Sequence, residues 1–83
     1  MIYEVIWESA AVNAAAGFLV DDGAGLADVL DAAGSLAEDP RPAAALRLGG
    51  PHRLRLHLGR YRLWYEVDDQ IGMVTVVRCG RTA

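Results

Sequence analysis

Residues 53–67 read RLRLHLGRYRLWYEV, and this stretch decides the fold. Polar and apolar side chains alternate strictly from Arg53 to Leu58, and the run after Gly59 alternates too, with Trp64 among its polar positions. This is the period-two pattern of half-buried strands. Because Gly59 is the only turn former between the runs, we expect a hairpin whose two-residue loop is drawn from Leu58 to Arg60. An even loop pairs odd positions of the first strand with even positions of the second. That register predicts one shared face for Arg53, Arg55, His57, Arg60, Arg62 and Trp64.

This predicted basic face suits a phosphate backbone with a stacked base, because guanidinium groups bind phosphates and an indole stacks on bases. The alternative for the arginines is a solvated strand face. Trp64 could stack on a base, pack on arginine stems or lie under a partner helix. His57 is either a general base or an ordinary exposed histidine.

Composition indicates a single domain spanning residues 1–83, with 53% hydrophobic residues to fill its core. One cysteine, Cys79, excludes an internal disulfide, fits a reducing compartment and is better placed as core than as nucleophile. The sequence opens on a strand pattern without a cationic leader, and no apolar run reaches the ~18 residues of a membrane span. We therefore expect a soluble, cytoplasmic protein with no membrane partner. No spacing of His, Cys or carboxylates predicts a metal site, and no cofactor is expected.

Charge is distributed unevenly along the chain, whose net charge is -3. Residues 1–40 hold eight acidic residues and no Lys or Arg, whereas residues 41–83 hold all eight arginines and three acidic residues. A local basic patch can bind an anion even on an acidic molecule. The use of Arg without Lys favours bidentate phosphate contacts, although a GC-rich genome would give the same composition.

The remaining segments complete a β-α-α-β-β-β order. Residues 2–7 predict a strand that is apolar on both faces and therefore internal to the sheet. Ser9 is a candidate N-cap for a first helix that breaks at residues 21–23, and a second helix should run from Gly25 to Glu38. The apolar stripe of the second helix consists of Leu26, Val29, Leu30, Ala33 and Ala37. Together the two helices form an antiparallel hairpin.

Residues 41–52 are expected to form a connecting loop, with or without a short helical turn, and residues 73–79 a fourth strand. An odd-length turn before this strand would place Val74, Val76 and Arg78 on the basic face and Met73, Thr75 and Val77 in the core. The predicted class is α+β, with the helical hairpin packed on a small, mainly antiparallel four-stranded sheet.

The segment 53–69, followed by VTVVRCGR at 74–81, resembles the C-terminal half of the RelE/ParE superfamily of type II toxin-antitoxin toxins, and is most similar to its RelE branch. The preceding strand and helical hairpin are similar in order and length, so the likeness covers the whole chain. Specific matches are confined to residues 46–81, with GRYRLWYEV at 59–67 the most specific. The resemblance implies a RelE-like fold.

The resemblance also implies a ribosome-dependent mRNA endoribonuclease that inhibits translation. Such a toxin binds mRNA in the 30S ribosomal A site, cleaves it without metal or cofactor, and is neutralised by a cognate antitoxin that lays an amphipathic helix or an extended acidic segment across it. Carried over by position, the implied catalytic residues are Arg55, Arg62 and Arg81, and His57 is added as the candidate base. The corresponding RNA-binding candidates are Arg53, Arg60, Trp64 and Arg78.

Three departures from the family pattern favour an alternative. The family pattern has an arginine two residues after the glycine that corresponds to Gly80, and this chain has Thr82 at that position. No tyrosine follows it. Where the family uses a lysine as candidate base, Arg55 cannot readily give up a proton, which leaves His57 or His52. The alternative is a non-catalytic or degenerate RelE/ParE module, either a gyrase inhibitor or a partner that only binds its antitoxin. Whether the chain is an enzyme therefore remains open from the sequence.

Overall fold

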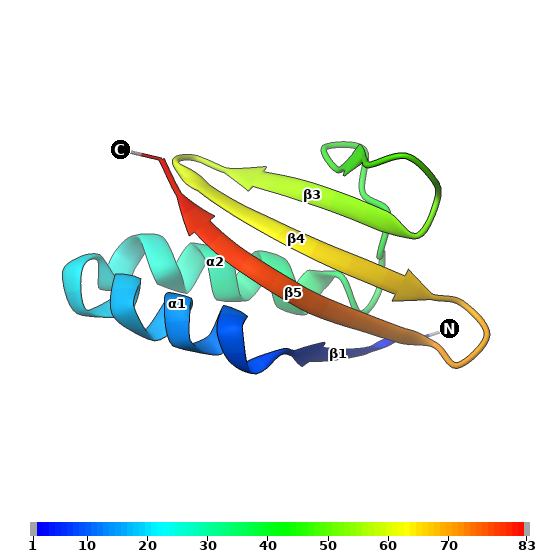
Figure 1. Ribbon diagram of the computed structural model, residues 1–83, viewed down its shortest axis with the longest axis horizontal. Helices are drawn as coiled ribbons and strands as arrows, with labels where there is room; N and C mark the ends of the chain where they lie inside the picture. The colour runs from blue at the N-terminus through cyan, green and yellow to red at the C-terminus, as the bar shows by residue number, and fades with distance from the viewer. Residues whose placement is uncertain (1, 83) are drawn as a thin grey trace.

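A computed structural model describes residues 2–82 of the chain. Two helices cover one face of a five-stranded sheet (Figure 1). The elements are β1 Glu4–Trp7, α1 Ser9–Asp21, α2 Gly23–Ser35, β2 Leu46–Arg47, β3 Arg53–Leu58, β4 Tyr61–Asp68 and β5 Met73–Arg81. The strand order is β1-β5-β4-β3-β2, in which β1 runs parallel to β5 and the other pairs are antiparallel. The predicted α+β class is confirmed, and β2 is an additional edge strand inside the predicted loop.

The β3–β4 hairpin has the predicted register. Leu58 pairs with Tyr61, so Gly59 and Arg60 form a two-residue loop. Gly59 has a φ of 63°, while no residue other than glycine has a positive φ among those described. A positive φ at the first central residue alone is the pattern of a type II′ turn, which glycine adopts without strain. Consequently Arg55 lies opposite Trp64 and His57 opposite Arg62 on one face of the sheet.

The predicted register of β5 is wrong. Asp68 pairs with Met73, which leaves an even four-residue turn, and Val74 and Val76 are fully buried in the core. The register then shifts between Trp64 and Tyr65. A β-bulge inserts one extra residue and reverses the alternation beyond it. Arg78 therefore lies opposite Trp64, on the predicted basic face, because of the bulge and not because of the turn.

The core lies between the helices and the sheet. Its largest fully buried side chains are Tyr65, Leu26, Leu36, Leu54, Leu63, Val29, Val74 and Val76. Burial, followed by the nearby charge of Asp39, raises the pKa of Tyr65 to about 12, and its hydroxyl donates to the Pro40 carbonyl at 2.8 Å. Of the predicted second-helix stripe, Leu26, Val29 and Ala33 are buried, whereas Leu30 is 49% exposed.

Two boundaries and one strand position differ from the prediction. Glu8, and not Ser9, occupies the N-cap position of α1, without a side-chain cap, and α2 ends at Ser35 before a turn. β1 is an edge strand, although it was expected to be internal. Tyr3, Val5 and Trp7 pack on the core, but the opposite face of this strand leaves Ile6 38% exposed. The apolar residues on both faces of β1 therefore do not indicate that both faces are buried.

The turn between the helices is fixed by Asp22. Its carboxylate accepts a hydrogen bond from the Gly25 N–H at 3.0 Å and another from the Tyr61 hydroxyl at 2.8 Å. These bonds, with that of Tyr61 first, lower the pKa of Asp22. A Cβ at Gly25 would overlap the Asp22 carboxylate and lie 2.9 Å from Tyr61 Cε2, so this position requires glycine. The helical hairpin is thereby anchored to the first residue of β4.

Candidate nucleic-acid interface

The arginines divide into paired and unpaired groups. Four form ion pairs: Arg41 with Asp69 at 2.8 Å, Arg53 with Glu66 at 3.4 Å, Arg60 with Asp22 at 3.6 Å and Arg81 with Asp21 at 3.1 Å. Within residues 2–82, the other four have no carboxylate within 4.0 Å; they are Arg47, Arg55, Arg62 and Arg78. An unpaired guanidinium keeps its charge and its donors for a ligand, so these four are the candidate anion-binding residues.

Three of the unpaired arginines share one face of the sheet, and we call Arg55, Arg62 and Arg78 the arginine cluster. They come from β3, β4 and β5, the three adjacent central strands, and lie on the face away from the helices. Arg47 differs because Leu54, its cross-strand neighbour on β3, is buried. The Arg47 side chain therefore lies on the helix-facing side of the sheet. His57 lies directly across from Arg62. The predicted placement of Arg55, His57, Arg62 and Arg78 on one face is confirmed.

Trp64 occupies the centre of the arginine cluster. The guanidinium carbon of Arg78 lies 4.5 Å from the centroid of its ring, and that of Arg55 lies 6.0 Å away. Both are within the range of cation–π attraction. The Nε atom of Arg55 is buried and has no hydrogen-bond partner among the described residues. Two of the three clustered arginines, Arg55 and Arg78, are therefore held by an aromatic ring and not by carboxylates.

Two predicted site residues lie elsewhere. Arg60 belongs to the hairpin loop, where strand alternation does not apply, and its guanidinium turns towards Asp22 beside the Tyr61 ring. Tyr61, the cross-strand neighbour of Arg81, is buried. The Arg81 side chain therefore lies on the helix side, with its guanidinium carbon 4.7 Å from the ring centroid of Phe18. The prediction that Arg60 shares the basic face is wrong, and Arg81 is not brought together with Arg55 and Arg62. Thr82 donates its N–H to the Arg60 carbonyl at 2.8 Å.

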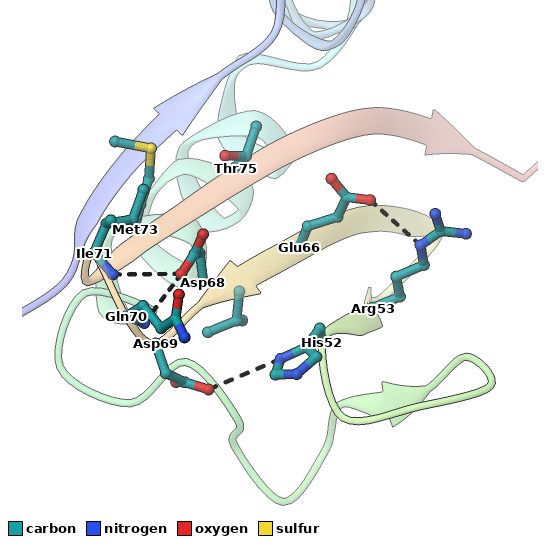
Figure 2. A pocket seen from close by; sticks show the side chains of 10 residues that line it. His52, Arg53, Glu66, Asp68, Asp69, Gln70, Ile71, Met73 and Thr75 are labelled. Carbon is teal, nitrogen blue, oxygen red and sulfur yellow. Dashed lines mark hydrogen bonds and ion pairs between the residues drawn. The ribbon is translucent and has the colours of Figure 1, made fainter.

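A pocket of about 530 Å³ lies at the other end of the hairpin, next to Arg53 (Figure 2). Figure 2 shows Glu66 directed at Arg53, and His52 directed at Asp69, which lies 3.8 Å from its Nδ1 atom. Asp68 accepts hydrogen bonds from the backbone of the β4–β5 turn. With three carboxylates in its lining, this pocket is unsuited to phosphate. Arg53 and His52 therefore differ from the arginine cluster in having acidic neighbours.

Asp69 connects three segments that are distant in sequence. It accepts hydrogen bonds from Arg41 in the loop after α2 at 2.8 and 2.9 Å, and from the Tyr3 hydroxyl at 2.7 Å. These bonds, with that of Arg41 first, lower the pKa of Asp69 to about 2. The interaction fixes the loop that leads into β2 and β3.

The described residues contain no group of three or more His, Cys, Asp or Glu side chains that could hold a metal ion. Cys79 is buried, and burial raises the pKa of its thiol, which disfavours the thiolate. No helix within residues 2–82 is long and apolar enough to cross a membrane.

Sequence reasoning did not single out Gly80, which lies opposite Arg62 on the arginine-cluster face. A Cβ at this position would lie 3.2 Å from Trp64 Cζ3. An isolated glycine in a strand often marks such a close approach, and this was the available signal. The sequence did not indicate the carboxylates that form ion pairs with Arg60 and Arg81, because these acidic residues are distant from the two arginines along the chain.

Comparison with known proteins gives structural matches only; no family model and no curated protein matches the chain. The toxin-antitoxin complex RelBE2 from Mycobacterium tuberculosis matches with 25% identity, a TM-score of 0.78 and coverage of 99% of this chain and 100% of that one. The RelE-RelB complex of Pyrococcus horikoshii matches with 22% identity, a TM-score of 0.85 and coverage of 98% and 96%. A YoeB/ParE toxin from Agrobacterium tumefaciens matches with 13% identity, a TM-score of 0.79 and coverage of 96% and 99%.

These matches define the class of protein: the chain has the fold of the RelE, YoeB and ParE toxins of toxin-antitoxin systems. The likeness to the RelE/ParE superfamily inferred from residues 46–81 is therefore confirmed, and RelE structures are among the matches, with TM-scores of 0.72 to 0.85. Identities of 13 to 25% do not separate RelE-type from ParE-type proteins.

The interaction of Asp69 predicts a pH-dependent stability. Because the pKa of Asp69 in the fold is about 2, below its ordinary 3.8, its carboxylate stabilises the folded state above about pH 4. That contribution is lost as the pH falls towards about 2. We expect Asp69→Asn to lower the unfolding midpoint in urea at neutral pH, and the difference from the wild type to shrink through this acidic range.

Asp28→Asn is the matched control, because the Asp28 side chain is exposed and makes no hydrogen bond or ion pair within residues 2–82. It should change the midpoint little at either pH. An Asp69→Asn difference that stayed constant from neutral pH to pH 2 would contradict the assigned pKa.

Proposed function

We propose that this protein is the toxin of a toxin-antitoxin pair and cleaves mRNA as a metal-independent endoribonuclease. The observation that carries the proposal is the arginine cluster. Three arginines from three adjacent strands share one face of the sheet, with no carboxylate within 4.0 Å of their guanidinium groups in the described chain. On a protein with net charge -3, an uncompensated cluster of this kind favours a polyanionic ligand. The toxin fold supports RNA as that ligand.

The chemistry of RNA cleavage fits the residues on this face. Attack of a 2′-hydroxyl on the adjacent phosphate builds negative charge on the phosphate oxygens, which fixed cations stabilise. Arg55 and Arg62 flank the position of His57, and guanidinium groups remain charged throughout the reaction. The reaction also needs a proton acceptor and a proton donor, and imidazole exchanges protons near neutral pH. We assign His57 the role of the base that takes the 2′-hydroxyl proton, because it lies directly across from Arg62. As the bond from the 2′-oxygen to phosphorus forms, the bond from phosphorus to the 5′-oxygen breaks, and the 5′-oxygen takes a proton from water.

Trp64 and Arg78 extend the interface along the bound strand beyond the reacting phosphate. Arg53, Arg60 and Arg81 contribute less, because each has a carboxylate partner. The proposed target is mRNA in the ribosomal A site. The basic face carries one imidazole, and the ribosome would supply the rest of the catalytic geometry.

The inhibitory partner that we propose is a cognate antitoxin with an amphipathic helix. Several structures that resemble this chain are complexes of a toxin with its antitoxin. An apolar groove of about 370 Å³ lies beside α1 and α2 and is lined by Trp7, Val12, Ala15, Ala16, Leu19, Leu26 and Leu30. Leu19 and Leu30 are about half exposed there. Residues 1–40 contain no Lys or Arg, so a helix with basic flanks is complementary to this surface.

Arg62→Gln tests the proposed activity. Losing one guanidinium aimed at the reacting phosphate should lower mRNA cleavage in a translating extract by about a hundredfold and relieve growth arrest. Arg47→Gln is the matched control, because Arg47 is also unpaired but lies on the other side of the sheet. It should leave cleavage unchanged. Equal effects of the two variants would remove the arginine cluster from the mechanism.

The same experiment addresses the ParE-type alternative, which the match to a YoeB/ParE toxin and the distant position of Arg81 favour. Growth arrest with codon-phased mRNA cuts supports the endoribonuclease. Arrest with DNA damage and intact mRNA would instead indicate a gyrase inhibitor, and no arrest would indicate a partner that only binds its antitoxin.

Leu30→Arg tests the antitoxin groove. A charged side chain among apolar contacts should weaken the complex with the antitoxin encoded beside the gene by at least about tenfold, measured by calorimetry. Val20→Arg is the control, because Val20 is 87% exposed on α1 and does not line the groove. If both variants bind the antitoxin like the wild type, the antitoxin helix does not dock in this groove.

A further inference from the structure

Trp64 is the cross-strand neighbour of two members of the arginine cluster. It pairs with Arg55 on β3 and with Arg78 on β5. The Arg78 guanidinium carbon lies over the indole at 4.5 Å from its centroid, and that of Arg55 lies at 6.0 Å. Arg62, two positions before Trp64 on the same strand, has no such contact with the ring in the described structure. Trp64 therefore holds two of the three unpaired arginines.

Gly80 gives the indole its place on the sheet. A Cβ at Gly80 would lie 3.2 Å from Trp64 Cζ3 and 3.5 Å from Cη2, so the ring lies close against the backbone of β5. Any side chain larger than hydrogen would push the ring away by a few tenths of an ångström. Gly80 is also the cross-strand partner of Arg62. The ring thus extends over β5 towards the centre of the cluster.

Holding an arginine by a ring differs from holding it by a carboxylate. An ion pair consumes guanidinium N–H donors and cancels the charge, as Asp69 does for Arg41. A cation–π contact restricts the side chain but leaves its charge and its donors available. Arg78 illustrates this, because its side chain is exposed and no carboxylate lies within 4.0 Å of it in the described chain. Arg55 buries its Nε, so its terminal nitrogens are the donors that face a ligand. Two guanidinium groups are therefore positioned and still able to bind phosphate.

The same contacts occupy the indole. The Arg78 guanidinium covers one face of the indole, so a nucleobase could stack on that face only by displacing it. We propose that Trp64 is the positioning residue of a phosphate clamp, holding Arg55 and Arg78 for neighbouring phosphates of single-stranded RNA while contacting no base itself. This inference rests on the proposed RNA-binding function of the arginine cluster. It predicts recognition of the backbone, independent of sequence, at this part of the interface.

The experiment measures binding of two probes to the full chain. One is a short single-stranded oligoribonucleotide, and the other has the same ribose-phosphate backbone without bases. Trp64→Leu should weaken binding of both probes equally, by roughly three- to tenfold, because two cation–π contacts are lost. Trp64→Phe should restore part of the affinity for both. A stacking role would instead give a loss confined to the probe that carries bases, and that result would overturn the proposal.

Double variants separate positioning from a general structural effect. Combined with Arg55→Gln and Arg78→Gln, Trp64→Leu should cause no further loss, because Trp64 acts through these arginines. Combined with Arg62→Gln, its effect should be fully additive. Additivity in both backgrounds would overturn the proposal. If the wild type binds neither probe, the proposed RNA-binding function itself fails, which is a different outcome from a base-dependent effect of Trp64.

Gly80→Ala provides a second variant that retains the indole. It should weaken binding of both probes in the wild-type background and have no effect when Trp64 is leucine. Gly34→Ala is its control, because no heavy atom lies within 4 Å of a Cβ there. A Gly80→Ala effect that persisted without the indole would contradict the role assigned to this glycine.

Discussion

The two-residue loop at Gly59 is the constraint on which the rest of the structure depends. A loop of this length fixes the register of β3 against β4, and the register decides which side chains share a face. It places Leu54, Leu56, Leu63 and Tyr65 against the helices and Arg55, His57, Arg62 and Trp64 on the opposite face. A shift by one residue would bury the guanidinium groups and expose the core. Core formation and the basic face therefore arise from the same pairing.

The acidic helical hairpin then sorts the arginines. Asp21 and Asp22, at the turn between the helices, form ion pairs with Arg81 and Arg60, which lie on the helix side near the hairpin loop. Among residues 2–82, one carboxylate on the far face of the central strands lies within 4.0 Å of an arginine: Glu66, which forms an ion pair with Arg53. What remains on this face is the arginine cluster, two members of which lie against Trp64. An overall acidic protein thereby keeps a locally basic face.

Much of this arrangement could be predicted from the sequence, because strict alternation around Gly59 permits one hairpin register. The two-residue β2 was missed because it is too short to show a period, and the edge position of β1 depends on partners that the sequence does not reveal. Arg78 reached the correct face through a bulge, whereas Val74 and Val76 were assigned to the wrong one. The ion pairs of Arg60 and Arg81 join residues far apart in the chain, which local patterns cannot predict.

The central claim is that Arg55, Arg62 and Arg78 bind phosphates, and the salt dependence of single-stranded RNA binding tests it most directly. Three phosphate contacts predict a slope of about -2 for the logarithm of the binding constant against the logarithm of salt concentration. Replacing any one of these arginines with glutamine should make the slope less negative by about 0.7. The ion-paired Arg60 and Arg81 should leave it unchanged when replaced. A slope near zero, or one that responds to Arg60 and Arg81 but not to the three clustered residues, would contradict the account.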